Sequence, residues 1–182
     1  MIEGLKVRSA LAPDIQRLIG FKHTCLSDYV WQLDLSKEEG QISISLRQVR
    51  LPRPVEVEYP RNHFTLADEW KNNTRTFVAI APDGTPIGYI RLLEQVAAAS
   101  VWVLDLVVAT EARRNGVASA LIRSIETWSL QRQYRQVFIE MSSKNHPAIS
   151  LMNKMGFEFS GYNDHYYATQ DVALFFGKLL KG

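Results

Sequence analysis

The chain has 182 residues, of which 46% are hydrophobic and 22% charged, values typical of a globular protein with one sizeable core. The formal net charge of +2 is too small for the strong field that binding to nucleic acid or a membrane surface uses, so we expect neither partner. The single cysteine, Cys25, excludes an internal disulfide and fits a reducing compartment, and no apolar run reaches membrane-spanning length, so we expect a cytoplasmic protein.

The first half of the chain predicts a mixture of strands and helices. Strands are indicated where apolar residues alternate, and helices where they recur every three or four residues. A segment with three prolines is typical of a sheet edge or a connection. The expected elements are strands over 5–11 and 41–51, helices over 12–23, 28–35 and 64–72, and the proline-rich edge or connecting piece over 51–61.

The second half has a clearer pattern. Asp83-Gly84 is a turn signal between two apolar runs, which predicts a β-hairpin. Asn145 is a typical N-cap, Pro147 suits a first helical turn, and Gly156 suits a helix end. The expected elements are strands over 76–80, 86–94 and 98–109, a helix over 116–133, a strand over 136–141, a helix over 145–156, and strands over 157–162 and 172–180.

A polar turn, RRNGVA over residues 113–118, lies where an apolar strand meets a helix. The first turn of a helix has unpaired N–H groups and a partial positive charge, so it can bind an anion. Gly116 and Ala118 are small enough to let a diphosphate approach the backbone, and Arg113 and Arg114 add charge at the rim. The alternative is an ordinary turn with solvated arginines. Neither a P-loop nor a dinucleotide-binding fingerprint fits, because the lysine and the further glycines are absent.

Two motifs together resemble the GNAT superfamily of acetyl-CoA-dependent N-acetyltransferases. Residues 113–118 match the pattern Q/R-x-x-G-x-G/A, and NHPAISLMNKMGF over 145–157 is similar to the second family motif. The resemblance covers 76–180 well and the first seventy residues only in outline. It implies an α/β fold with a mixed, largely antiparallel central sheet, flanking helices and a splayed central pair of strands. It also implies a single domain over 1–182, in which 1–75 select the acceptor and 76–180 bind acetyl-CoA.

The resemblance further implies where the cosubstrate binds. Backbone amides of the polar turn would hold the pyrophosphate, the backbone of the preceding strand would pair with the pantetheine arm, and Asn145 would meet the far end of that arm. The implied acetyl-CoA-binding residues are Leu106, Val107, Val108, Arg113, Arg114, Asn115, Gly116, Val117, Ala118, Ser119 and Asn145. The histidines are too far apart in sequence to suggest a metal site, so we expect no metal.

Amine acetylation requires a neutral amine, and two carboxylates are candidates for the base. Glu140 lies at a position similar to the catalytic glutamate of ribosomal-protein N-terminal acetyltransferases, and Asp105 lies within an otherwise apolar strand. Partial burial would raise the pKa of either carboxyl toward a useful value. The alternative for each is a carboxylate that pairs with an arginine or binds the acceptor ammonium without proton transfer.

The proton donor to the leaving thiolate departs from the family pattern. The family commonly has a tyrosine seven residues after the motif asparagine, and this chain has Met152, whose thioether cannot donate a proton. Tyr166 and Tyr167, in a loop that borders the acceptor site in relatives, are the other candidates. Their alternative role is aromatic packing at the mouth of the site.

The acceptor is expected to be the amine of a small cationic molecule, such as a streptothricin-like antibiotic or a polyamine, because residues 151–180 resemble streptothricin-type acetyltransferases. The alternative acceptor is a peptide or protein N-terminus. A further alternative is that the protein is a sensor, which binds acetyl-CoA without transferring the acetyl group. A homodimer is possible, and the final strand could mediate it.

Overall fold

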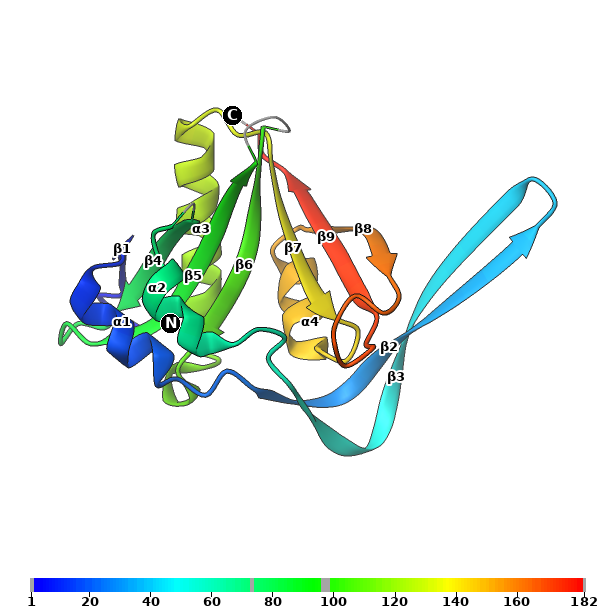
Figure 1. Cartoon of the computed structure of the whole chain (residues 1–182), viewed down its shortest axis with the longest axis horizontal. Coiled ribbons are helices and arrows are strands. Elements are labelled where there is room, and N and C mark those ends of the chain that lie inside the picture. Colours follow the sequence, from blue (N-terminus) through cyan, green and yellow to red (C-terminus); the bar gives the residue numbers. More distant parts are fainter. Residues whose placement is uncertain (1, 73, 96–98, 182) are drawn as a thin grey trace.

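The computed structural model describes residues 2–72, 74–95 and 99–181 (Figure 1). Ala98, the first residue of one expected strand, lies outside these ranges. In chain order the elements are β1 (Lys6–Ser9), α1 (Ala12–Ile19), β2 (Cys25–Glu38), β3 (Gln41–Val57), the 3-10 helix η1 (His63–Thr65), α2 (Leu66–Glu69), β4 (Thr74–Ile80), β5 (Pro86–Gln95), β6 (Ser100–Val108), the 3-10 helix η3 (Thr110–Ala112), α3 (Val117–Gln131), β7 (Gln136–Ser142), α4 (His146–Lys154), β8 (Glu158–Asn163) and β9 (Ala173–Leu179).

Seven of the strands form one sheet in the order β1-β4-β5-β6-β7-β9-β8. All neighbours are antiparallel except β6 and β7, which are parallel. These two strands pair only between Ser100–Val103 and Gln136–Ile139, and beyond that point they diverge (Figure 1). The expected fold class is confirmed, including the splayed central pair.

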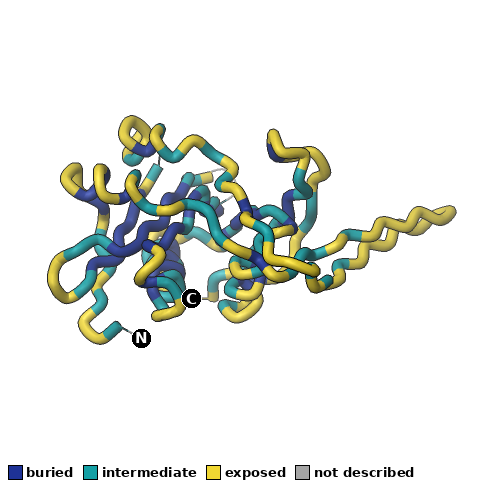
Figure 2. Tube along the Cα trace, turned by 90° about the horizontal axis from the view of Figure 1, so that it is seen from below, coloured by how far each residue is buried: buried dark blue, intermediate teal, exposed yellow. Residues whose placement is uncertain are grey.

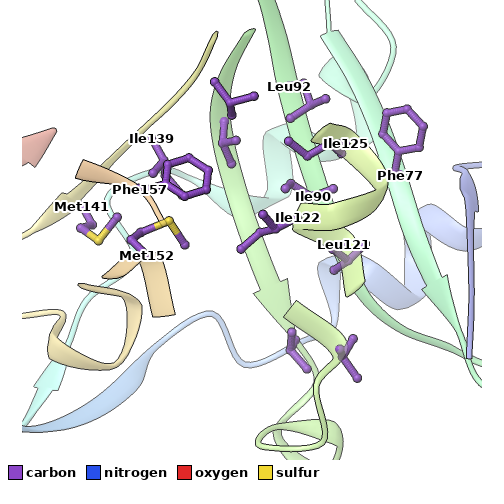
Figure 3. Close-up of a cluster of buried hydrophobic side chains, with 14 of the residues drawn as sticks. Phe77, Ile90, Leu92, Leu121, Ile122, Ile125, Ile139, Met141, Met152 and Phe157 are labelled. Carbon is purple, nitrogen blue, oxygen red and sulfur yellow. The ribbon is translucent and has the colours of Figure 1, made fainter. Parts of the chain in front are cut away.

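The larger hydrophobic core lies between the sheet and the helices α3 and α4. Leu121, Ile122 and Ile125 of α3 are fully buried against Ile90 and Leu92 of β5 (Figure 3). A second cluster covers the opposite face, because alternate residues of a strand point to opposite sides. There α1 contributes Ile15 and Leu18, which pack against β4 and β5.

One extra residue interrupts the ladder between β5 and β6. Arg91 pairs with Asp105, whereas the next residue, Leu92, pairs with Val103. Leu104 is therefore a β-bulge, which adds a residue to one strand and changes the side-chain alternation beyond it.

The bulge decides where Asp105 points. In a regular strand Val103, Asp105 and Val107 would all point to the same face. Val103, before the bulge, packs in the core beneath α3, whereas Val107, after the bulge, packs in the cluster on the opposite face. Asp105 therefore lies on the face away from α3, which it shares with Trp102.

Two expectations for the first half are wrong or need correction. Residues 28–35 form part of β2 and not a helix, because Trp31, Leu33 and Leu35 alternate with polar residues and pair with β3. The proline-rich 51–61 is strand as far as Val57. Pro52 and Pro54 lie where the ladder is interrupted, between the pairs Tyr29–Arg50 and Ser27–Val55, and Pro60 lies beyond the end of the strand, so none of them takes a ladder hydrogen bond away.

The other boundaries differ only in length. The first helix ends at Ile19 instead of residue 23, and the helix expected over 64–72 consists of η1 and the four-residue α2. The hairpin, the helix beginning beside Gly116, and the strands and helix that follow are confirmed in the expected order. The final strand, β9, lies between β7 and β8, so its two edges are already paired and a dimer through it is not available.

Candidate active site

A cavity of about 790 Å³ opens where β6 and β7 diverge. Its walls come from both diverging strands, from the first turns of α3 and α4, and from the segment that follows β3. The lining includes residues 57–61, 104–108, 112–114, 116–119, 139–142, 145, 147–148, 150–152 and 167–169. Since the splay leaves one side of Leu106, Val107 and Val108 without a strand neighbour, their backbone groups can accept an added, strand-like ligand.

The polar turn before α3 has the backbone geometry of an anion site. Arg114 and Gly116 both have positive φ angles, 65° and 84°, so the backbone folds back on itself before the helix begins. Such turns direct successive N–H groups into one concavity. No side chain of the described residues caps the start of α3, and Gly116, Val117, Ala118 and Ser119 line the cavity. The turn therefore fits a diphosphate.

Arg113 has a different role from the rim charge expected of it. Its guanidinium donates to the carbonyl oxygen of Val108 at 3.0 Å, and to those of Lys22 and Thr24 at 2.7 and 3.1 Å. These bonds tie the start of β2 to the end of β6. Asn115 also acts locally, since its side-chain amide donates to the Arg113 carbonyl at 3.1 Å. Arg114 lines the cavity beside them.

Asn145 is the N-cap of α4, as expected. Its Oδ1 accepts a hydrogen bond from the Ala148 N–H at 3.1 Å and from the Cys25 thiol at 3.5 Å. Burial raises the pKa of the Cys25 thiol. A buried thiol that remains protonated is a poor nucleophile, so nothing in this geometry indicates a covalent cysteine intermediate.

Glu140 lies on β7 at the cavity wall, and its side chain is only 3% exposed. One carboxylate oxygen accepts from the guanidinium of Arg61. The other accepts from the Trp102 indole N–H at 3.1 Å and from the Tyr166 hydroxyl at 2.9 Å. A carboxylate oxygen offers two acceptor positions, so Glu140 is strongly held on both sides.

Asp105 is buried on β6 and forms an ion pair with the equally buried Arg91 on β5. It also accepts from the Tyr59 hydroxyl, and its Oδ1 lies 3.6 Å from Nη1 of Arg61. Both candidate carboxylates thus pair with arginine, which is the alternative considered for each from the sequence. Arg61 contacts both of them and therefore links β6 to β7.

A chain of aromatic residues continues from Asp105 toward His23. The Tyr59 ring lies 4.8 Å from the His23 ring, centroid to centroid. His23 Nε2 lies 3.0 Å from the Tyr89 hydroxyl, and its Nδ1 lies 2.7 Å from the carbonyl oxygen of Phe21. Burial lowers the pKa of His23, so the neutral ring donates from Nδ1 to this carbonyl and accepts from Tyr89 at Nε2.

The two candidate tyrosines differ in their surroundings. Tyr166 is 44% exposed and donates to Glu140. Tyr167 lines the cavity; its hydroxyl is buried and has no hydrogen-bond partner among the described residues. Burial raises the pKa of Tyr167, so this hydroxyl keeps its proton. Met152 is fully buried and lines the same cavity.

Sequence reasoning missed the cations of the site. Arg91 had the same signal as Asp105, a charged residue inside an apolar strand, and the register pairs the two directly. Arg61 and Tyr59 had no comparable signal, because they belong to a proline-rich connection whose path over the sheet is set by tertiary structure. Trp102 was missed as well; it stacks on Phe138 and donates to Glu140.

The part of the chain that the structure describes contains neither a metal-binding cluster nor a membrane-spanning helix. Over 2–72, 74–95 and 99–181, no group of three or more His, Cys, Asp or Glu side chains is placed to hold a metal ion. No described helix combines the length and the apolar character needed to cross a membrane.

Comparison with known proteins adds to this geometry. Residues 44–157, more than half of the chain, match the family described as Acetyltransferase (GNAT) family. Streptothricin acetyltransferase of Streptomyces lavendulae is 24% identical over 164 residues, which cover 88% of this chain and 85% of that protein.

Two solved structures share the fold along almost the whole chain. Nourseothricin acetyltransferase superposes with a TM-score of 0.81 and 22% identity, covering 97% of this chain and 99% of the other. A putative streptothricin acetyltransferase from Bacillus anthracis str. Ames, solved in complex with acetyl coenzyme A, superposes with a TM-score of 0.75 and 20% identity over the same shares. By the family match and this shared fold, the chain belongs to the GNAT family of acetyltransferases.

Proposed function

We propose that the protein transfers the acetyl group of acetyl-CoA to a primary amine of a small cationic molecule, such as a streptothricin-like antibiotic or a polyamine. The observation that carries the acceptor class is the charge of the ion-pair cluster around the two candidate carboxylates. Three carboxylates, those of Glu69, Asp105 and Glu140, contact two guanidiniums, those of Arg61 and Arg91. The cluster keeps one negative charge in excess, which favours a cationic acceptor over a neutral or anionic one.

The cosubstrate is proposed to bind in the cavity between β6 and β7. The amides from Arg114 to Ser119 would hold the pyrophosphate at the uncapped start of α3. The backbone of residues 106–108 would pair with the pantetheine arm, and Asn145 would contact its end. We therefore assign acetyl-CoA binding to residues 76–180 and selection of the acceptor to residues 1–75. The second assignment is supported by Tyr59 and Arg61, which lie within 1–75 and contact the two candidate carboxylates.

Glu140 is proposed as the base that takes the proton of the acceptor ammonium. Asp105 is the second candidate, and the exposure of their partners distinguishes the two. Arg61, which pairs with Glu140, has a side chain that is 27% exposed, whereas Arg91, which pairs with Asp105, is 5% exposed. A cationic acceptor can displace a partly exposed guanidinium far more easily than a buried one, so Glu140 is the carboxylate that an amine reaches.

Tyr167 is proposed as the proton donor, and Tyr166 as the residue that orients Glu140. In the transfer, the amine nitrogen bonds to the acetyl carbon while the carbon–sulfur bond breaks and its electron pair leaves with sulfur. The nitrogen loses a second proton as the amide forms, and this proton replaces the one that Tyr167 gives to sulfur. The Tyr167 hydroxyl has a proton and no partner for it among the described residues, and it lines the cavity with Met152. It would therefore supply the proton that a thioether at position 152 cannot.

A small acceptor is favoured over a peptide by the segment that follows β3. Residues 57–61 line the cavity, which narrows the space for an extended chain. Peptide N-terminal acetylation is the alternative, and a sensor that binds acetyl-CoA without transfer is the second alternative.

One assay separates these functions. The purified protein is incubated with acetyl-CoA and a panel containing a streptothricin, polyamines, aminoglycosides and short peptides, and release of the coenzyme A thiol is followed. Release with the streptothricin or a polyamine supports the proposal, and release with peptides alone refutes the acceptor class. Thermal stabilisation by acetyl-CoA with no release from any acceptor would indicate the sensor.

A further inference from the structure

Four aromatic side chains lie beside Glu140 on the face of the sheet away from α3 and α4. Trp102 pairs directly with Phe138, and Phe175 pairs directly with Glu140, and directly paired residues lie on the same face. The ring centroid of Trp102 lies 5.6 Å from that of Phe138 and 5.9 Å from that of Phe175. Tyr166, which donates to Glu140, has its ring 5.5 Å from that of Phe175. We call Trp102, Phe138, Phe175 and Tyr166 the aromatic shelf, because contact between the rings makes them one continuous surface.

A glycine in β9 makes room for one of these rings. Phe138 of β7 pairs with Gly177 of β9. A Cβ atom at position 177 would lie 2.8 Å from Cε1 and 3.1 Å from Cδ1 of Phe138, so the ring lies directly over this glycine. Glycine within a strand weakens the strand and often marks a close approach of another group. Gly177 therefore allows the Phe138 ring to lie over β9, where it extends the surface that begins at Glu140.

The aromatic shelf is open to a ligand. On this face α1 packs against β4 and β5, but no helix of the described residues lies over β7 and β9 (Figure 1). The hairpin of β2 and β3 forms a two-stranded ribbon whose outer part is exposed and extends away from the body, so it does not cover this face (Figure 2). Trp102, Phe138 and Phe175 are partly exposed, and Tyr166 is 44% exposed. None of the four lines the cavity in which acetyl-CoA is proposed to bind, so the shelf and that cavity can be occupied together.

Charge selects the kind of ligand that fits the aromatic shelf. The face of an aromatic ring is electron-rich and attracts a cation that lies within about 6 Å of the ring centroid. Among the described residues, a lysine or arginine lies over three other rings and over none of the shelf rings. The shelf also adjoins Glu140, part of the ion-pair cluster that keeps one negative charge in excess. Both features favour a cationic ligand over a neutral or anionic one.

We propose that the aromatic shelf binds a second cationic group of the acceptor while the reacting amine lies at Glu140. This inference rests on the proposed function, which places the reacting amine there. Glu140 and Phe138 are two residues apart on one strand, a separation of about 7 Å. A linear chain of five carbon atoms between two nitrogens, with bonds of about 1.5 Å, covers roughly this distance. The shelf would therefore favour a linear diamine or polyamine over a monoamine of the same length.

Steady-state kinetics with two matched acceptors test the aromatic shelf. Cadaverine is a linear diamine with five carbon atoms, and pentylamine is the same chain with one amine. The wild-type protein is expected to have a kcat/KM at least about fivefold higher for cadaverine. Phe138→Leu keeps apolar bulk but removes the ring, so it should raise the KM for cadaverine and abolish this preference. Phe138→Tyr keeps the ring and should retain the preference, as should Phe159→Leu, which removes a partly exposed ring that packs against Phe176 on the opposite face.

Isothermal titration tests the same site without turnover. Cadaverine is titrated into the protein saturated with coenzyme A, which has no acetyl group to transfer. The wild-type protein should bind it about fivefold more tightly than Phe138→Leu does. Phe175→Leu is a second variant if Phe138→Leu does not fold, as judged by far-UV circular dichroism.

The outcomes separate this proposal from the proposed function. Equal affinities of wild type and variant, or no binding by the wild type, overturn the aromatic shelf as a cation site. Acetyl transfer with equal kcat/KM for cadaverine and pentylamine also overturns it and leaves the proposed function standing. Weaker binding by Phe138→Leu, in a protein that transfers acetyl to no acceptor, supports the shelf and refutes the proposed function.

Discussion

The guanidinium of Arg61 donates to the Glu140 carboxylate on β7 and, at 2.6 Å, to the carbonyl oxygen of Leu104 on β6. One side chain from the segment that follows β3 thus bridges the two strands where they separate. The bulge makes this possible, because Leu104 is the extra residue whose carbonyl is not used by the ladder.

Replacing Glu140 by glutamine is expected to lower kcat by about a hundredfold and to leave acetyl-CoA affinity nearly unchanged. The loss should shrink as the pH rises, because the free amine then becomes abundant without a base. Steady-state kinetics across pH, with cofactor titration, measure both effects. Glu158→Gln, a substitution at an exposed glutamate on β8, is the control. A small loss that does not depend on pH removes Glu140 from the mechanism.

Tyr167→Phe is expected to lower kcat about tenfold or more without lowering stability. The Tyr167 hydroxyl has no partner among the described residues, so its removal breaks no hydrogen bond and relieves the cost of an unsatisfied buried group. Tyr166→Phe, in contrast, removes the 2.9 Å bond to Glu140. Kinetics and thermal unfolding of both variants test this, and unchanged turnover of Tyr167→Phe excludes Tyr167 as the donor.

Gly116→Glu is expected to raise the Kd for acetyl-CoA at least about tenfold, equivalent to about 1.4 kcal/mol. The substitution adds a negative charge where the diphosphate is proposed to bind. It also adds strain, because the φ angle is 84°. Gly84→Glu is a matched control, with a φ angle of 86° in a turn that does not line the cavity. Isothermal titration should show weaker binding only for Gly116→Glu, and equal effects of both would place the cosubstrate elsewhere.

Arg91→Met is expected to lower the free energy of unfolding by about 3–5 kcal/mol, because it leaves the buried Asp105 without its closest cation. The side chains of this pair are 5% and 1% exposed. Arg75→Met breaks a comparable pair with Glu94, whose side chains are 55% and 24% exposed, and should cost less than about 1 kcal/mol. Urea denaturation measures the free energy of unfolding of both variants. Similar losses would mean that burial does not increase the contribution of the Arg91–Asp105 pair to stability.

Asp14 links the start of α1 to β1 and makes stability depend on pH. Bidentate hydrogen bonds from Arg8, at 2.7 and 2.9 Å, and a bond from the Leu11 N–H hold the pKa of Asp14 below its ordinary value. A lowered carboxyl pKa gives stabilisation that is complete above the unfolded value of about 3.9 and is lost as the pH falls through the folded value. Asp14→Asn should therefore cost about 1 kcal/mol at neutral pH. Urea titrations down to about pH 2 should show this difference disappearing; a difference independent of pH contradicts the assignment.

The elements that depend on residue types close together in the chain could be predicted from the sequence. The helix that starts beside Gly116 and the N-cap at Asn145 depend on residue types at fixed positions, and both lie where they were expected. The ribbon strand over residues 28–35 was mistaken for a helix, although Trp31, Leu33 and Leu35 alternate. Over so few residues an apolar pattern can fit either a strand or a helix, and only the pairing with β3 shows that this segment is a strand.

Some residues of the candidate site could be predicted from the sequence and others could not. Asp105 stands out as a charge in an apolar strand and Glu140 by its position in the family resemblance, and the structure places both at one cavity. Arg61 and Tyr59 were missed because no local pattern marks them; they reach the carboxylates only after the chain has passed through the ribbon and returned across the sheet. The role of Arg113 was misread for a related reason, since the carbonyls of Lys22 and Thr24 that it binds are about ninety residues away in sequence.

The bulge at Leu104 makes the faces of β6 depend on strand pairing in a way that composition does not reveal. If Leu104 took a regular place in the ladder, every side chain on one side of it would change face. Asp105 would then turn into the hydrocarbon interior beneath α3, and its neighbours in sequence would turn outward. Asp105 thus lines the cavity only because the ladder leaves Leu104 out.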